Sequence, residues 1–125
     1  MATDPQFLTS VRTEMGQISV ANTNRDGTGT IVSIFTAGAS GSKILSIEVK
    51  ATGNTTGNIV RFFLNDGVNK RLWYELTSSV TTVSGTVQSF YQRIAPDLLL
   101  ESGWSLEAST NAAETFNVIA TGGDY

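Results

Sequence analysis

The sequence contains neither cysteine nor histidine, and only two of its 125 residues are proline. Without cysteine, disulfide bonds, thiolate metal sites and cysteine nucleophiles are excluded, and the redox compartment cannot be inferred. Without histidine, the chain lacks the commonest general base and the commonest metal ligand, so most hydrolase mechanisms lose their central residue. We therefore predict that the protein is not an enzyme, with no catalytic residue, no metal site and no cofactor.

Positive charge is also scarce, because eight Lys and Arg residues stand against eleven Asp and Glu, a net charge of −3. A nucleic-acid surface needs clustered positive charge, and here only Lys70 and Arg71 are adjacent. No apolar run approaches the roughly 20 residues that span a bilayer, and the first residues lack the features of a signal peptide. We expect no nucleic acid and no membrane as a partner, and a chain made in soluble form in the cytoplasm.

Apolar residues recur mostly with a period of two, which is typical of β-strands. Residues 43–51 alternate most clearly, with Leu45, Ile47, Val49 and Ala51 on one face and Ser46, Glu48 and Lys50 on the other. Other runs, separated by turn residues, occur at 17–21, 29–37, 58–64, 70–76, 85–94, 98–103, 104–109 and 114–120. A single domain of this length with such regular spacing predicts an all-β fold, an antiparallel β-sandwich that is jelly-roll-like with about eight strands.

The turns predict two of the strand pairings. Residues 29–37 and 43–51 flank a Gly-Ala-Ser-Gly turn, so we expect them to form consecutive antiparallel strands. Residues 58–64 and 70–76 flank a loop whose Gly67 can adopt a positive φ, which predicts a hairpin. The inward-facing candidates of this hairpin are Val60, Phe62, Leu64, Leu72, Tyr74 and Leu76.

The first dozen residues differ from the rest, since a polar, proline-broken stretch is followed by two apolar residues and no clear alternation. We expect residues 1–12 to form an N-terminal arm and residues 13–125 to form the β-sandwich domain. A disordered tail with two incidental apolar residues is the alternative. If the segment is an arm, its candidate partner-contact residues are Phe7, Leu8, Val11 and Arg12.

Several polar and aromatic residues are candidates for a catalytic, calcium or sugar-binding site. A glycosidase would need two facing carboxylates, and the candidates are Glu48, Asp66, Glu75, Glu101, Glu107 and Glu114; those on strand faces are expected to be solubilising surface groups. Loops 22–27 and 65–69 carry oxygen ligands suited to calcium, but with one carboxylate each they favour simple Asx turns. Trp73 and Trp104 could stack on a sugar, although packing in the core or a subunit interface is favoured.

The ordered motifs from about Asn22 to Tyr125 resemble a family of small structural proteins of tailed bacteriophages and prophages. The segments that carry the resemblance are Asp26-Gly-Thr-Gly-Thr-Ile, Phe35-Thr-Ala-Gly, Lys50-Ala-Thr-Gly-Asn-Thr-Thr-Gly, Val60-Arg-Phe-Phe, Asp66-Gly, Leu100-Glu-Ser-Gly-Trp-Ser-Leu-Glu-Ala-Ser-Thr and Glu114-Thr-Phe-Asn-Val-Ile-Ala-Thr-Gly-Gly-Asp-Tyr. These motifs consist of turn residues and alternating strand residues rather than catalytic signatures, so they indicate kinship more than function.

The resemblance implies a head decoration, or cement, protein that binds and stabilises a capsid shell. It implies a homotrimer on the exterior of the virion, with the major capsid protein as partner, synthesis in the host cytoplasm, and an N-terminal segment that contacts the shell. Two alternatives stay open. The chain could be a tail or fibre component, or it could be a carbohydrate-binding module on the virion that holds host glycans through Trp73 and Trp104.

Overall fold

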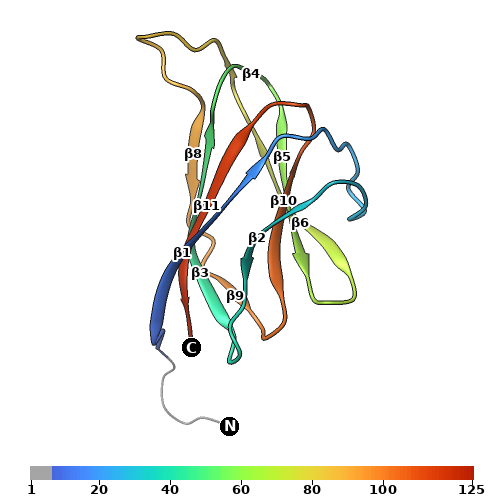
Figure 1. Ribbon diagram of the computed structural model, residues 1–125, viewed down its shortest axis with the longest axis vertical. Coiled ribbons are helices and arrows are strands. Elements are labelled where there is room, and N and C mark those ends of the chain that lie inside the picture. The colour runs from blue at the N-terminus through green and yellow to red at the C-terminus, as the bar shows by residue number, and fades with distance from the viewer. Residues whose placement is uncertain (1–6) are drawn as a thin grey trace.

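Two antiparallel sheets packed face to face make up the computed structural model, which describes residues 7–125 (Figure 1). Its strands are β1 (Ser10–Ile18), β2 (Val32–Thr36), β3 (Ser42–Ala51), β4 (Thr55–Thr56), β5 (Ile59–Asn65), β6 (Lys70–Thr77), β7 (Val80–Thr81), β8 (Tyr91–Ile94), β9 (Leu98–Leu100), β10 (Ser105–Thr110) and β11 (Phe116–Asp124). Residues 7–125 include no helix that could span a membrane.

The strand order follows the jelly-roll pattern. The first sheet has the order β1-β11-β3-β8, with β9 pairing to the other half of β3, and the second has the order β2-β10-β5-β6. Strands β8 and β9 therefore act as one interrupted strand beside β3, and β4 and β7 form a separate two-stranded ribbon. Setting that ribbon aside leaves eight principal strands, and the chain crosses to the other sheet after each of them except at the β5–β6 hairpin, as in a jelly roll. The predicted all-β sandwich is confirmed.

The hydrophobic core lies between the sheets, because the inward residues of both sheets are apolar and almost fully buried. The core cluster consists of Ile18, Ile34, Phe35, Ile44, Ile47, Val49, Ala51, Val60, Phe62, Leu76, Leu100, Leu106, Ala108, Phe116, Val118 and Ala120. Every one of the eight principal strands contributes at least one of these residues or a partly buried neighbour. The sandwich is therefore held together by contacts between residues far apart in sequence.

One predicted pairing is wrong. Strands β2 and β3 lie in different sheets, since β2 pairs with β10 while β3 pairs with β11, β8 and β9. The turn between them closes with a hydrogen bond from the Gly41 N–H to the Gly38 carbonyl, 3.0 Å long. Turn residues mark where the chain reverses, but they do not fix whether it returns in the same sheet or crosses to the opposite one.

The alternation predicted for residues 43–51 breaks at Leu45. Ile44 is fully buried and Leu45 is 42% exposed, because the register of β3 against β11 shifts at this point. A β-bulge places one extra residue on β3 and reverses the facing of the residues before it. From Ile47 onwards the predicted inward face is correct.

The hairpin predicted at 58–76 is confirmed as β5 and β6. Val60, Phe62 and Leu76 are buried as expected, whereas Leu64 and Leu72 are half-buried and Tyr74 is 37% exposed. The pairing shifts between Phe62 and Phe63 so that Trp73 has no partner residue. This bulge on β6, the outermost strand of the second sheet, turns Trp73 towards the core and leaves the Tyr74 side chain partly exposed to solvent.

Two strand boundaries also differ. Strand β1 begins at Ser10, inside the segment expected to be an arm, so the first sheet includes residues 10–12. Residues 1–6 of that arm lie outside the described residues. The run at 85–94 contributes only Tyr91–Ile94, since the residues before it form a loop. In β1 the apolar Val11 and Met15 face outwards, and Ile18 is the only large apolar residue on the inward face, which is why core periodicity did not reveal most of the strand.

Candidate functional site: the bare outer face of the first sheet

The outer face of the second sheet is covered by the chain itself. Arg61 and Phe63 alternate with core residues of β5 and so point away from the core, yet they are 2% and 0% exposed. The cover is the β1–β2 connection, residues 19–31, since the Arg61 guanidinium donates to the Asn22 carbonyl at 3.1 Å. Arg25 of the same connection donates to Glu75 at 2.8 Å, and Glu75 also accepts from Arg61 at 3.0 Å.

Gly27 shows how closely this connection approaches the sheet. It has a φ of +87°, and a Cβ at this position would lie 2.8 Å from the Cβ of Lys70 in β6. Glycine allows both the conformation and the close approach. The segment therefore packs directly on the sheet and leaves little of this face for a partner.

The outer face of the first sheet has no comparable cover among the described residues. Val11 and Met15, which alternate with inward residues of β1, are 76% and 78% exposed. Met15 pairs with the half-buried Ile119 of β11. Val11 and Met15 lie four residues apart on this face with Thr13 between them, and two apolar side chains this exposed on one strand face are candidates for a binding surface. We call this surface, formed by Val11, Met15 and Ile119, the β1 patch.

Polar pairs lie between and beside the residues of the β1 patch and hold the two strands in register. The Thr13 and Thr121 hydroxyls lie 3.4 Å apart, and the Gln17 amide donates to Asn117 at 2.9 Å. These cross-strand contacts fix the orientation of the outer face without covering it. The patch is consequently part of a rigid sheet rather than of a loose arm.

The four predicted contact residues fall into different environments. Phe7 is 75% exposed, Val11 belongs to the β1 patch and Leu8 is half-buried. Arg12 instead points inwards, where its guanidinium lies 4.0 Å from the centre of the Phe35 ring. The same group bonds Asp124, Glu14 and the Thr36 carbonyl. Arg12 therefore helps to hold β1 against β11 and the end of β2 at the edge of the sandwich.

Asp124 is the main partner of Arg12. Its Oδ1 atom accepts hydrogen bonds from the Ser42 hydroxyl and from Arg12, at 3.0 Å from Nη2. The Ser42 hydrogen bond, followed by that of Arg12, lowers the pKa of this carboxyl from its usual value. This network ties β1, β3 and β11 to the end of β2, so it stabilises the edge from which the β1 patch is presented.

Sequence reasoning did not identify Met15 or Ile119. The only available signal was the spacing of Val11 and Met15, four residues apart and therefore on one face of a strand. This spacing is informative only if residues 10–18 are first recognised as a strand.

The two tryptophans pack against the core. Trp73 meets Phe62 edge to face, with ring centroids 6.4 Å apart, and it contacts Tyr74 at 5.6 Å. Trp104 lies in the turn before β10, and both rings are partly buried against the core cluster. The packing that the sequence favoured for these residues is thus present, and it reduces the ring surface on which a sugar could stack.

Five of the six carboxylates considered for catalysis are engaged in separate structural contacts, and the sixth, Glu101, lies exposed in a turn. Glu107 is 6% exposed rather than at the surface as expected, because it lies near Lys70 and accepts from Asn65. Glu48 accepts from Tyr91 and Glu114 from Thr56. Among residues 7–125, no group of three Asp or Glu residues is placed to hold a metal ion.

The loops considered for calcium form Asx turns, as the sequence favoured. Asp66 accepts hydrogen bonds from the Val68 and Asn69 N–H groups at 2.9 and 2.7 Å, which lower the pKa of its carboxyl, the Asn69 bond most strongly. Asp26 accepts from the hydroxyl and the N–H of Thr28, and these bonds lower the pKa of its carboxyl in the same way.

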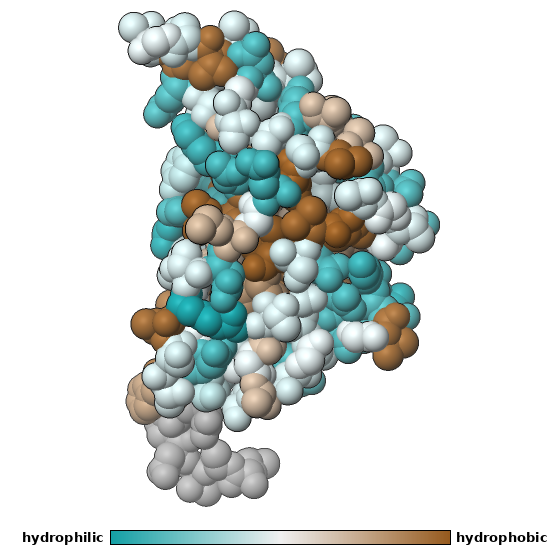
Figure 2. Space-filling view, in the orientation of Figure 1, coloured by the Kyte–Doolittle hydropathy of each residue, from teal (hydrophilic) through white to brown (hydrophobic). Residues whose placement is uncertain are grey.

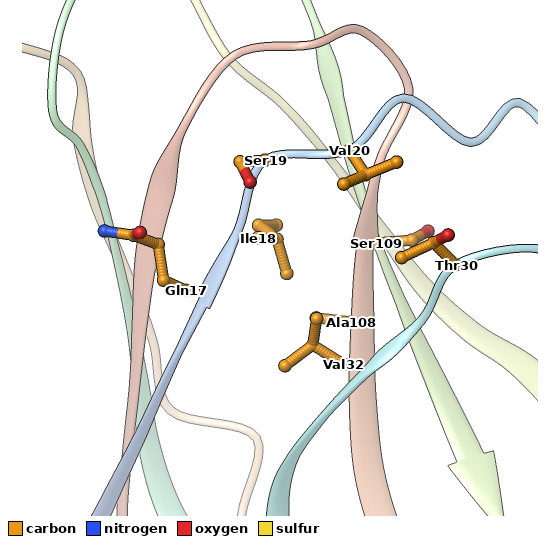
Figure 3. Close-up of a pocket in the computed structure, with 8 residues that line it drawn as sticks. All are labelled: Gln17, Ile18, Ser19, Val20, Thr30, Val32, Ala108 and Ser109. Carbon is orange, nitrogen blue, oxygen red and sulfur yellow. The ribbon is translucent and has the colours of Figure 1, made fainter.

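A shallow pocket opens where β1 leads into the β1–β2 connection. It is lined by Gln17, Ile18, Ser19, Val20, Thr30, Val32, Ala108 and Ser109 (Figure 3). Figure 2, drawn in the orientation of Figure 1, shows apolar residues gathered across the middle of the molecule, in the region of this pocket. The pocket has a volume of about 40 Å³, whereas small-molecule sites usually have roughly 300–1,000 Å³. It has no titratable side chain and is too small for a sugar ring, so we regard it as a gap at the sandwich edge.

A scan against protein-family models and a search of curated proteins give no match. Among solved structures, the chain is similar to a chain in the acidic stable capsid structure of Helicobacter pylori bacteriophage KHP30, with a TM-score of 0.61 and 12% identity over 94% of this chain and 90% of that one. A chain of the cyanophage Pam1 capsid asymmetric unit gives a TM-score of 0.49 and 13% identity, over 100% and 94% of the two chains. A pentameric capsid protein from metagenomic phage sequences gives 0.42 and 18%, over 89% and 60%. The chain therefore shares its fold with a chain of the KHP30 capsid.

Proposed function

We propose that this chain is a structural protein of a phage virion, and specifically a head decoration protein that binds and stabilises the capsid shell as a homo-oligomer. The jelly-roll fold shared with a chain of the KHP30 capsid supports a place in the virion. The observation that carries the binding role is the β1 patch, because Val11 and Met15 are more than three-quarters exposed on a rigid sheet.

In this proposal the major capsid protein is the partner, and the chain lies on the exterior of the shell after synthesis in the host cytoplasm. Phe7 and Val11 make the apolar contacts, and Leu8 packs beside them. Arg12 contributes by holding the edge in place through Asp124. Association into a homotrimer is part of the same proposal.

The test is binding of purified chain to undecorated phage heads, followed by electron microscopy of the particles. Replacing Val11 and Met15 together by serine should weaken binding at least roughly tenfold, because the loss of apolar contact area at two exposed positions costs more than about 1.4 kcal/mol. The matched control is Val68→Ser, since Val68 is 88% exposed at the tip of the β5–β6 loop. Equal binding by the two variants would contradict the proposed contact.

The N-terminal segment needs a separate deletion that stops before the sheet. Because β1 begins at Ser10, a deletion of residues 1–8 leaves the strand intact, whereas a deletion of 1–12 would also remove Arg12. We expect the shorter deletion to keep the oligomer and to reduce binding to heads. Density on the tail or its fibres would instead favour the tail alternative.

Glycan binding is tested with the two tryptophans. If a glycan array identifies a specific sugar, Trp104→Ala and Trp73→Ala should remove that binding without unfolding the chain, as followed by circular dichroism. That result, together with unchanged binding of the double serine variant to heads, would replace the decoration role by attachment to host glycans.

A further inference from the structure

Strand β1 is an edge strand with an unpaired side. It pairs with β11 over its whole length, and no other strand among the described residues pairs with it. An open edge of nine residues presents backbone N–H and C=O groups that can pair with a strand of another chain. The question is which strand fits this edge.

The hydrogen-bond pattern of β11 determines which groups of β1 are free. Tyr125 donates to the Gly41 carbonyl and Thr52 donates to the Thr115 carbonyl, so odd-numbered residues of β11 bond towards β3. Its even-numbered residues then bond towards β1. Since Ser10 pairs with Asp124, the even-numbered residues of β1 bond to β11. The N–H and C=O groups of the odd residues, from Val11 to Gln17, therefore face the open edge.

The sequence of β1 is complementary to itself in one antiparallel register. When Thr13 faces Thr13 of a second copy, Val11 lies opposite Met15 and Arg12 lies opposite Glu14. The first two of these pairings fall on odd residues, whose backbone groups are free to bond. Arg12 and Glu14 then form the closer, non-hydrogen-bonded pair, in which side chains approach best.

The neighbouring registers that also match the free backbone groups are less suitable. A shift of two residues in one direction places Arg12 opposite Arg12, and a shift in the other direction places Glu14 opposite Glu14. Like charges directly opposite each other destabilise a strand pair. Charge thus selects the register centred on Thr13.

We propose that β1 binds β1 of a second copy of this chain, antiparallel about a two-fold axis at Thr13. This deepens the self-association in the proposed function, but it uses the backbone edge of β1, whereas shell binding uses the outer face. The contact is isologous and joins two copies. A three-fold oligomer would have to use another surface.

Single cysteines test the register, because the chain has none of its own. Directly opposite residues of a hydrogen-bonded pair have Cα atoms about 5.5 Å apart, within the range of about 4.4–6.8 Å for disulfides. Thr13→Cys should therefore form a disulfide-linked dimer under mild oxidation. A mixture of Val11→Cys and Met15→Cys should cross-link the two variants to each other. Each alone should not, because the two copies of either residue lie about 13 Å apart along the strands.

The matched control is Thr121→Cys, on β11 directly beside Thr13. In the proposed dimer two other strands separate the two copies of this residue, so their Cα atoms lie about 14 Å apart and cannot be bridged. Cross-linking of Thr13→Cys that does not exceed that of Thr121→Cys would overturn the proposal. So would efficient cross-linking of Val11→Cys with itself.

A charge reversal gives a second test, in which the compared variants all carry the same thiol. In the Thr13→Cys background, Glu14→Arg places two positive charges opposite each other and should lower the dimer yield roughly fivefold. Glu101→Arg makes the same change in an exposed turn and should leave the yield unchanged. Equal yields would exclude the register. Because these measurements use the purified chain alone, their failure is distinct from a failure to bind phage heads.

Discussion

The outer faces of the two sheets contrast sharply. On the second sheet, Arg61 and Phe63 point outwards and are nevertheless buried beneath residues 19–31. On the first sheet, Val11 and Met15 also point outwards and remain more than three-quarters exposed. Both faces belong to similar sheets in one small domain, so strand position alone does not determine exposure. The chain uses its own connection to cover one face, whereas among residues 7–125 no such segment covers Val11 and Met15 on the other.

The largest effect is expected at Phe63, which lies outside the core cluster but is fully buried. Phe63→Ala should lower the free energy of unfolding by about 3–4 kcal/mol, the range for a buried phenylalanine. Chemical denaturation measures the loss. Phe7→Ala, at a phenylalanine that is 75% exposed, serves as the control and should cost less than about 0.5 kcal/mol. A small loss at Phe63 would mean that the cover opens in solution.

A somewhat smaller effect is expected at Arg61. Replacing it by alanine leaves Glu75 and the Asn22 carbonyl without their buried donor, which should cost about 3 kcal/mol. It should also make residues 19–31 susceptible to limited proteolysis. Arg25→Ala removes the other, largely exposed partner of Glu75 and should cost below about 1 kcal/mol. If both variants lose the same stability, burial does not distinguish the two ion pairs.

Acid should weaken both regions together. The pKa of Asp124 is lowered from 3.8, first by the Ser42 hydroxyl and then by Arg12, and that of Glu75 is lowered from 4.5, first by Arg25 and then by Arg61. A depressed folded-state pKa stabilises the fold above the unfolded value, and that stabilisation is lost as pH falls through the folded value. The free energy of unfolding should therefore decrease below about pH 4.5.

Two variants separate the contributions to this acid response. Asp124→Asn should flatten the pH dependence at the β1 edge, and Glu75→Gln should flatten it at the covered face. Denaturation at a series of pH values measures both. An unchanged profile in either variant would show that the corresponding carboxylate does not contribute.

The smallest effect on stability is expected at the β1 patch. Met15→Ser should change the free energy of unfolding by less than about 0.5 kcal/mol, because the side chain is 78% exposed and loses little packing. The same variant should reduce association with phage heads, which light scattering or sedimentation can follow. A large loss of stability would instead show that Met15 supports the fold.

Periodicity was sufficient to predict the sandwich and the β5–β6 hairpin, because the buried faces of most strands are continuous and apolar. It failed at Leu45, where the bulge depends on pairing with β11, a strand about 75 residues away in sequence. Burial of Glu107 could not be predicted for a similar reason. The groups that surround it, Lys70 and Asn65, come from the distant β5–β6 hairpin.

The candidate site was only partly accessible to sequence reasoning. Phe7 and Val11 were identified as contact residues, and both are exposed. Most of strand β1 was missed: the run predicted at 17–21 includes only its last two residues, and the other inward positions include Arg12, Glu14 and Gly16, which do not resemble a core face. Gly16 packs closely against the opposite sheet, since a Cβ would lie 2.7 Å from Cδ1 of Ile34. Such a strand is recognisable only once the opposite sheet is known.

The pairing of β1 with β11 has a consequence for how the molecule is made. Ser10 pairs with Asp124, so β1 cannot pair until β11, at the other end of the domain, has been synthesised. Long-range closure of this kind slows folding. It also delays the ordering of the outer face, since Val11 and Met15 are aligned in a strand only when β11 docks.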